Sequence, residues 1–394
     1  MVEAVKLFHE GDVAEVGGLA LGLPSGRSAV LARWTVETVP YGYGAPATGG
    51  LYRVRGTSAG GDAFSIFVKQ LQHVRHWRRL AMMPVGRRDS FIREFPWKQE
   101  LAAWEDGFAH RLPEGLRVPE LYRVSDIGDD RLLLWMEDID AVEDVWPVSR
   151  YERAAYLLGG LAALRSGPEA LAMAVMGQGK VLSRYAAGRI GGVVVPLLHS
   201  DEVWRHPLLA DAVDARLRTD LIGLVAELGP LIDRLTALPA AMPHGDASPQ
   251  NLLVPRSTPD SLVAIDISMQ SPMPLGFDLG QLLVGLVHAA MLSAAELPAV
   301  HGVLVPAYQA GLRDHGVVAA ADKILLGYAG ALLVRAGFTS LPFELLTDAR
   351  ESVDDELAAT FGERAALTRF IVDLGLEILR PPAATNRLVG CVSP

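Results

Sequence analysis

Apolar and polar residues alternate along the first third of the chain, which is the pattern typical of half-buried β-strands. Three such segments are separated by the Gly/Pro-rich stretch PYGYGAPATGG and by the turn TSAGGD; they cover residues 28–39, 51–56 and 63–71. Residues 118–139 predict two more strands joined by a Gly-Asp turn, and residues 97–112 space their apolar side chains as a helix does. Up to Asp138 the pattern therefore predicts the order β-β-β-α-β-β, with an antiparallel meander first.

Helical spacing dominates the rest of the chain. Residues 149–165 and 208–238 give the clearest helices, a loop with short strands is expected at 244–267, and helices then continue to about residue 378. The apolar stretches 282–300 and 324–338 contain charged residues or proline, so buried helices are favoured over membrane spans. The fold class predicted is α+β with two lobes, namely an N-terminal lobe with an antiparallel sheet plus one helix and a larger, mostly helical C-terminal lobe; the expected ranges are 1–138 and 139–394.

Composition narrows the class of protein. The chain has 394 residues, of which 50% are hydrophobic and 21% charged, so we expect a globular protein with more than one core. The formal net charge of -10 argues against general nucleic-acid binding. The single cysteine, Cys391, excludes an intramolecular disulfide. The N-terminus lacks an apolar core of signal-peptide length, and we expect a cytoplasmic protein without membrane association.

The stretch HGDASPQN, residues 244–251, carries candidate chemistry. Asp246 and Asn251 share one loop, and Asp266 follows in an apolar strand where an unpaired carboxylate would cost several kcal/mol. Carboxylate and amide oxygens suit magnesium, and magnesium held by few protein groups usually has phosphates in its shell. The segment therefore predicts a nucleotide site in which Asp246 is left to accept a proton.

Phosphoryl transfer also needs a cation that holds the phosphates. Lys69 is one of five lysines and ends an apolar strand, and Glu100, on the predicted helix, is placed to orient it. The loop GYGAPATGG, with Thr48 and Gly49, is expected to lie over the phosphates with its backbone amides. The segment LLLWMEDI, with Met136 and Asp138, is expected to connect the lobes and to meet adenine through backbone groups.

These residues, over about 30–285, resemble the aminoglycoside phosphotransferase and choline kinase type of small-molecule kinase, which has a protein-kinase-like fold. The family motif H-x-D-x-x-x-x-N is matched by His244, Asp246 and Asn251. The resemblance implies that Asp246 is the catalytic base and that Asn251 and Asp266 are magnesium ligands. It implies further that His244 supports the loop and that Asp278, in GFDLG, braces it.

The resemblance implies transfer of the γ-phosphoryl group of ATP or GTP to a hydroxyl of a small molecule. The acceptor expected is an aminoglycoside or another antibiotic, with a sugar, amino sugar, choline or homoserine as the alternative. A nucleotide-binding pseudokinase and a hydrolase are the remaining alternatives. Two features depart from the family: Ile267 and Ser268 follow the metal aspartate in place of an aromatic residue, and the phosphate loop lacks a glycine triplet.

Several other patterns are weaker. MGQGK, at 176–180, fails as a phosphate loop because Val181 replaces the Ser/Thr, and it is expected to be a surface loop. His73 and His76 lack a third metal ligand, so they and the arginines of 75–93 are expected on a solvated face. The acidic helix predicted at 343–363 offers three carboxylates to ammonium groups or to solvent, namely Glu351, Asp354 and Asp355. Glu94 and Glu105 compete with Glu100 as the partner of Lys69.

Overall fold

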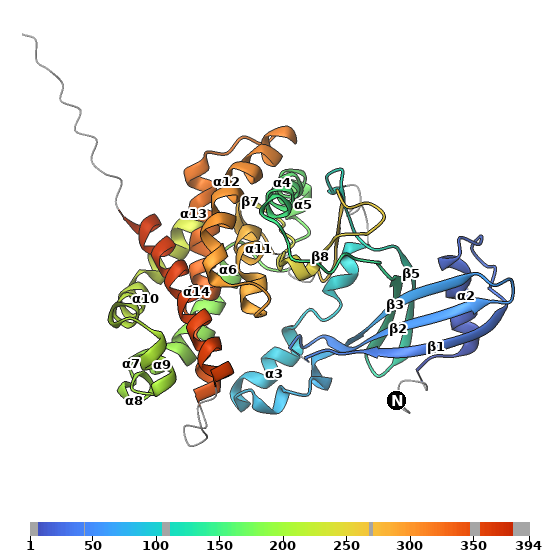
Figure 1. Ribbon diagram of the computed structural model, residues 1–394, viewed down its shortest axis with the longest axis horizontal. Helices are drawn as coiled ribbons and strands as arrows, with labels where there is room; N and C mark the ends of the chain where they lie inside the picture. The colour runs from blue at the N-terminus through green and yellow to red at the C-terminus, as the bar shows by residue number, and fades with distance from the viewer. Residues whose placement is uncertain (1–6, 43, 105–110, 268–270, 347–354, 381–394) are drawn as a thin grey trace, which may run out of the picture.

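The N-terminal part is built on one antiparallel sheet. The computed structural model describes residues 7–42, 44–104, 111–267, 271–346 and 355–380. Five strands pair in the order β1-β2-β3-β6-β5, on the right of Figure 1. Their bounds are β1 Leu31–Val39, β2 Thr48–Ser58, β3 Ala63–Gln72, β5 Leu121–Gly128 and β6 Arg131–Glu137. The predicted meander and the later strand pair are confirmed.

The two faces of the sheet are used differently, as the two-residue period of a strand requires. Ile66 and Val68 of β3 are fully buried in a core on one face, which helix α2 (Glu10–Ala20) covers. Phe67 and Leu71, which alternate with them, belong to a smaller apolar cluster on the opposite face. Lys69 has the parity of this second group, so the strand presents it on the face turned away from α2.

The segment between β3 and β5 corrects a prediction. In place of one helix at 97–112, the chain forms α3 (Val85–Glu94) and a 3-10 helix, η3 (Gln99–Ala103), preceded by η1 (Val74–His76) and η2 (Leu80–Met82). Pro96 explains why α3 ends at Glu94, because the residue before a proline is driven out of helical geometry and Phe95 has an extended backbone with ψ 121°. In η3 the backbone N–H groups of Leu101 and Trp104 donate to the carbonyl oxygens three residues earlier, which is the 3-10 pattern and not the α-helical one. Residues 105–110, with Glu105, lie outside the described residues.

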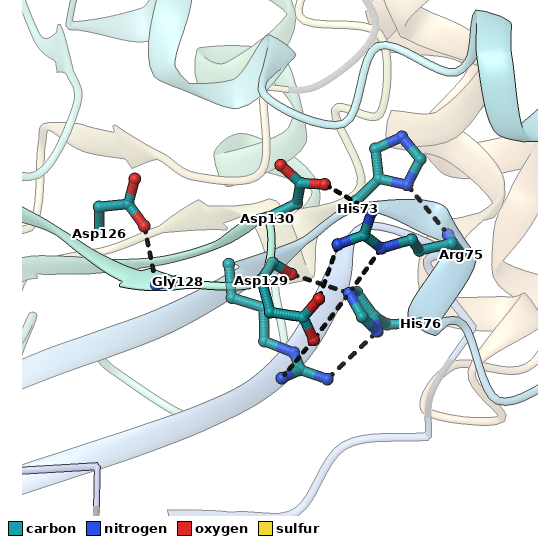
Figure 2. A network of polar contacts seen from close by, with 8 residues as sticks. His73, Arg75, His76, Asp126, Gly128, Asp129 and Asp130 are labelled. Atoms are coloured by element: carbon teal, nitrogen blue, oxygen red, sulfur yellow. Dashed lines mark hydrogen bonds and ion pairs between the residues drawn. The ribbon is translucent and has the colours of Figure 1, made fainter.

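The histidines of the basic stretch are part of a structural network (Figure 2). Arg75 forms ion pairs with Asp129 at 2.7 Å and with Asp130 at 2.9 Å, which ties η1 to the two-residue turn between β5 and β6. His76 Nε2 lies 2.9 Å from the carbonyl oxygen of Asp129, and His73 Nδ1 accepts a hydrogen bond from the backbone of Arg75. Part of this stretch therefore also fastens the sheet, while most arginines of 75–93 are exposed, as expected for a solvated face.

Helices make up most of the C-terminal part (Figure 1). The prediction at 149–165 is confirmed by α4 (Val148–Leu164). The segment 208–238 is interrupted at Asp214, whose carboxylate caps a new helix by accepting hydrogen bonds from the next backbone N–H groups. The other helices are α5 Pro168–Leu171, α6 Lys180–Tyr185, η5 Ala186–Val194, α7 Val195–His199, α8 Asp201–Trp204, α9 Pro207–Ala212, α10 Ala215–Thr236, η7 Ala294–Glu296, α12 Leu297–Asp314, η9 Phe343–Leu346 and α14 Asp355–Leu379.

Helices α4 and α12 pack so closely that two glycines are required. A Cβ atom on Gly159 would collide with the carbonyl oxygen of Tyr308, and one on Gly311 would collide with that of Tyr156. The predicted apolar stretch 324–338 is confirmed as buried, since α13 (Ala321–Leu332) and the π-helical turn η8 (Leu333–Gly337) lie in the main core. The stretch 282–300 is buried as far as residue 287, in α11 (Phe277–His288), whereas most of 289–299 is exposed because α11 ends there.

One helical segment has the length and composition of a membrane span. It is Lys180–His199, running through α6, η5 and α7, and 22% of its most apolar window is buried. Core helices of soluble proteins also pass such a test, so the expected absence of membrane association stays a prediction. Cys391 falls in 381–394, and Glu351 and Asp354 fall in 347–354; both ranges lie outside the described residues.

Short strands lie within the segment 244–267 and on either side of it. They are β7 Ala240–Ala241, β8 Leu252–Leu253, β9 Leu262–Ala264 and β10 Met273–Pro274, and a further short strand, β4 Leu116–Arg117, comes from the N-terminal part. β8 and β9 pair as an antiparallel hairpin, and β4 pairs with β9 in parallel. The hairpin is therefore joined by backbone hydrogen bonds to the segment that leads into the N-terminal sheet.

Candidate functional site

The β8–β9 hairpin places Asn251 and Asp266 at the same end. Asn251 immediately precedes β8, and the backbone N–H of Ile265 donates to its carbonyl oxygen at 3.0 Å. Asp266 is the next residue, so two oxygen-bearing side chains are brought together by pairing of the strands. Asp266 has φ 58°, a left-handed conformation that is uncommon for a residue with a side chain. Such backbone strain is concentrated at functional sites.

The loop before β8 is held by a buried carboxylate. Asp278, in the first turn of α11, accepts hydrogen bonds from the backbone N–H groups of His244 at 2.8 Å and Gly245 at 2.9 Å. Burial raises the pKa of Asp278 in spite of these donors and the nearby Arg165. The His244 ring is fully buried, and its Nδ1 accepts from the backbone of Asp246 at 3.3 Å. Among the described residues its Nε2 has no hydrogen-bond partner.

Asp246 is held by two side-chain amides. Asn251 Nδ2 donates to both its carbonyl oxygen and its Oδ2, at 2.9 and 3.2 Å. Gln281 Nε2 donates to Oδ1 at 2.7 Å. Gln281 was not predicted, although its spacing of three from Asp278 places both on one face of α11. These contacts fix the direction in which the carboxylate of Asp246 points and leave it half-buried.

A half-buried arginine supports the same loop and was also missed. Arg335 donates to the carbonyl oxygen of Gly245 at 2.9 Å, and its guanidinium lies 5.1 Å from the ring centre of Phe277. Burial lowers the pKa of Arg335, and the charge of Asp246 opposes this effect. The hydroxyl of Tyr185, at the end of α6, donates to the backbone carbonyl of Arg335 at 2.8 Å. The sequence offered one signal for this role, namely a positively charged residue within the apolar stretch 324–338.

Lys69 joins the two parts of the molecule. Its Nζ lies 2.7 Å from Glu100 Oε2, on η3, and 2.8 Å from Asp266 Oδ1, after β9. Lys69 is 8% exposed and Glu100 6%, so both charges have been removed from water and each depends on its partner. Of the acidic residues considered as partners of Lys69, Glu100 forms the contact, whereas Glu94 pairs with Arg184 at 3.4 Å.

The pKa values of this cluster follow from burial and from sharing one cation between two carboxylates. Burial disfavours the charged lysine, but Glu100 and Asp266 outweigh it and raise the pKa of Lys69. Burial likewise works against the charge of Asp266, but Lys69 prevails and lowers the pKa of Asp266. For Glu100, burial exceeds the effect of Lys69, and the charge of Asp266 adds to it, so the pKa of Glu100 is raised.

A cavity of about 1000 Å³ opens beside this cluster. Glu100, Asp266 and Thr48 line one end of it. From there it extends under α3 to the loop before α6 and to α6 itself, where Met176 and Arg184 line it. Met176, in the stretch 176–180 that was predicted to be a surface loop, thus also lines this cavity.

The remaining predicted residues lie in different environments. Thr48 is buried at the start of β2 and lines the cavity, whereas Gly49 lines a separate cavity of about 400 Å³ with Gln70. Met136 is buried in the apolar cluster of β6. The carboxylate of Asp138 accepts hydrogen bonds from Arg53, at 2.8 Å for the closer oxygen, and from the hydroxyl of Ser65. The side chain of Asp138 is therefore engaged within the sheet, which leaves its backbone for any contact with a base.

The donor atoms suit a magnesium ion. Asn251 uses its amide nitrogen for Asp246, which leaves its Oδ1 as a ligand, and Asp266 uses only Oδ1 for Lys69 among the described residues. The side chain of Asp266 is 35% exposed. No group of three or more His, Cys, Asp or Glu side chains in the described ranges is arranged around a metal. A magnesium ion held here would therefore need phosphate and water oxygens to complete its shell.

No family model and no curated protein sequence matches this chain. Its fold is similar to several solved structures at low identity. One is an aminoglycoside phosphotransferase from Alicyclobacillus acidocaldarius, at 15% identity over 87% of this chain and 92% of that chain, with a TM-score of 0.49. Another is an amicoumacin kinase in complex with AMP-PNP and Ca²⁺, at 14% over 95% and 96%, with a TM-score of 0.46. A spectinomycin phosphotransferase gives 11% over 93% and 99%, with a TM-score of 0.47.

Proposed function

We propose that this protein is a small-molecule kinase that moves the γ-phosphoryl group of ATP, or of GTP, to a hydroxyl group. One observation carries the proposal. Lys69, from the N-terminal sheet, is bound at once by Glu100 and by Asp266, and Asp266 lies beside the loop that holds Asp246 and Asn251. These contacts support a phosphate-binding cation, two oxygen donors for a metal and a candidate base next to a cavity that Glu100 and Asp266 line. The boundary of the two lobes is proposed at residue 138.

Each residue has a distinct role in the proposed reaction. Lys69 binds the phosphates, Glu100 orients it, and Asn251 and Asp266 would hold magnesium. When bound, magnesium would neutralise charge on the phosphate oxygens. The hydroxyl oxygen of the acceptor forms the new bond to the γ-phosphorus, the bond from that phosphorus to the bridging oxygen breaks, and the nucleoside diphosphate leaves. The proton of the hydroxyl goes to the carboxylate of Asp246.

The supporting residues make these roles consistent with the geometry. Asp246 is oriented by Asn251 and Gln281, so its carboxylate is preorganised before any substrate arrives. His244 and Asp278 support the backbone of the loop. Thr48 is proposed to approach the phosphates, since it shares the cavity with Asp266, and Gly49, Met136 and the backbone of Asp138 are proposed to serve the rest of the nucleotide.

An antibiotic is the class of acceptor that we propose to test first, which would give the enzyme a resistance role. A sugar, an amino sugar, choline or homoserine is the second class. A pseudokinase is disfavoured because the base and both metal ligands are present, and a hydrolase is disfavoured because the cavity extends well beyond the phosphate end. A cytoplasmic location is proposed, since the cytoplasm supplies magnesium and ATP.

The test is nucleoside diphosphate release with ATP or GTP and magnesium across a panel of antibiotics, sugars and amino alcohols. We expect one acceptor class to stimulate turnover, and we expect the Asp246→Ala variant to lose that stimulation while it still binds nucleotide. Turnover that no acceptor increases would favour the hydrolase. Absence of ATP and GTP binding would contradict the proposal.

A further inference from the structure

The far end of the large cavity differs in chemistry from the end at Lys69. It is lined by apolar and aromatic side chains of α3 and the segment after it, and by apolar side chains near α6. Phe91, Phe95 and Trp97 form the aromatic part of this wall, and the rings of Phe91 and Phe95 lie 5.1 Å apart. A compound held there would contact mainly carbon atoms, which favours a ligand with an apolar or aromatic face.

The charges around the cavity are unfavourable for a polycation. Every described carboxylate that lines it is already paired: Glu100 and Asp266 with Lys69, and Glu94 with Arg184. The remaining charged side chain of the lining is Arg87 on α3. The far end therefore has two arginines against one carboxylate, and an ammonium-rich ligand would meet no unpaired carboxylate among the described lining residues.

The two walls of this end come from both parts of the chain and touch each other. The guanidinium of Arg87 lies against η5, since Cβ atoms on Gly188 and Gly192 would be 3.5 and 3.7 Å from its nitrogens. The α6 wall is in turn fastened to the loop of Asp246, because Tyr185 donates to Arg335 and Arg335 donates to Gly245. A ligand in the cavity is thus held against an element that is anchored to the proposed base.

From these observations we infer that the cavity binds the phosphoryl acceptor and selects a hydroxylated compound with an apolar or aromatic face and with neutral or negative charge, in preference to a polycationic aminoglycoside. That the bound compound is the phosphoryl acceptor rests on the proposed function, but the binding preference of the cavity does not. Among antibiotics, the inference favours uncharged or acidic compounds as acceptors. Among the other candidate acceptors, it disfavours amino sugars and choline, which are cationic.

The test is a binding measurement on the full chain that needs no turnover. Isothermal titration compares 2-naphthyl β-D-glucopyranoside, a neutral aromatic compound with hydroxyl groups, with kanamycin, a polycationic aminoglycoside. We expect the naphthyl glucoside to bind at least tenfold more tightly. Phe91→Ala should weaken naphthyl glucoside binding by roughly tenfold through loss of one aromatic contact. Val318→Ala, at a position 91% exposed between α12 and α13, is the matched control and should change nothing.

A charge reversal gives a second, independent readout. Arg184→Glu removes one cation and leaves Glu94 unpaired, so kanamycin binding should strengthen by several fold while naphthyl glucoside binding changes little. The inference is overturned if kanamycin binds the unaltered protein more tightly, if naphthyl glucoside shows no binding at millimolar concentration, or if Phe91→Ala has no effect. Naphthyl glucoside binding without any nucleotide binding would instead contradict the kinase proposal and leave the cavity preference standing.

Discussion

The loop of Asp246 and the cluster of Lys69 are held in place by different means. The buried Asp278 accepts hydrogen bonds from backbone N–H groups of the loop. The carboxylate of Asp246 accepts hydrogen bonds from side chains of the same C-terminal part. Lys69 is held by two side-chain ion pairs, one to a short 3-10 helix and one to a residue of strained backbone. The hydrogen bonds of the loop fix the position of Asp246. The ion pairs of Lys69, in contrast, can exchange for other contacts when a phosphate competes for the same cation.

This difference predicts which variants damage chemistry, which damage stability and which damage nucleotide affinity. Changes in the loop should act on turnover and on the free energy of unfolding. Changes at the ion pairs should act on nucleotide binding, because those pairs must partly exchange for contacts with phosphate oxygens.

The largest effect is expected for Asp246→Asn. The amide keeps the shape of the side chain but accepts no proton, so turnover should fall by about 10³-fold with nucleotide affinity nearly unchanged. Product release under saturating nucleotide and acceptor measures this effect. Asp260→Asn, at an exposed position of the same hairpin, is the control. Turnover within tenfold of the unaltered protein would remove Asp246 from the role of base.

The next effect is expected in stability, for Asp278→Ala. The change leaves two buried N–H groups without an acceptor and should lower the free energy of unfolding by roughly 3 kcal/mol. Urea denaturation measures it, and Asp322→Ala, in the exposed first turn of α13, should cost well under half as much. Equal losses of unfolding free energy in the two variants would show that the hydrogen bonds of Asp278 to the loop do not stabilise the protein more than an exposed carboxylate does.

A smaller effect is expected for Glu100→Gln, in nucleotide affinity. Lys69 would lose one of its two charged partners, and the Kd for magnesium-ATP should rise by about tenfold. Equilibrium dialysis measures it, with Glu152→Gln on the exposed side of α4 as the control. An unchanged Kd would mean that Asp266 alone positions the lysine.

The same variant sharpens a pH prediction. Because the pKa of Glu100 is raised, its carboxylate takes up a proton at a higher pH than usual as the solution is acidified. Lys69 and Asp266 stay charged, since their pKa values are raised and lowered respectively. Affinity for magnesium-ATP should therefore weaken on acidification, and Glu100→Gln should flatten that dependence. A slope that persists in the variant would assign it to another group.

The smallest effect is expected for Gln281→Leu. Loss of the hydrogen bond to Asp246 Oδ1 should reduce turnover by roughly fivefold, which is the size of one such bond. Gln250→Leu, exposed in the same loop, is the control. Unchanged turnover in Gln281→Leu would show that this amide does not help to position Asp246.

Local patterns in the sequence were sufficient for the strands and for the short-range motif. Alternation predicted β1, β2, β3, β5 and β6, and the spacing of Asp246 and Asn251 required only that one loop fold back on itself. The helix expected at 97–112 was wrong over the described residues 97–104, where the chain forms the 3-10 helix η3, because apolar spacing alone does not separate a 3-10 turn from an α-helix. Glu100 was nevertheless expected beside Lys69, and the structure brings them together on a shorter element.

Long-range partners were the part that periodicity could not supply. Gln281 and Arg335 reach the loop of Asp246 from helices 35 and 90 residues away, and only the packing of α11 and η8 brings them there. The role of α3 as a cavity wall also depends on tertiary contacts. Its own sequence indicates a basic helix, but it does not indicate that Arg87 lies against the glycines of η5.

The central claim is that Lys69 and Asp266 form a magnesium-dependent nucleotide site. Isothermal titration of the full chain with AMP-PNP, with magnesium and with EDTA, tests it most directly. We expect binding that strengthens by at least tenfold with magnesium and loses that gain in Asp266→Asn, whose amide is a poorer ligand. Binding of equal strength with and without magnesium, or none for AMP-PNP and for GMP-PNP, would contradict it.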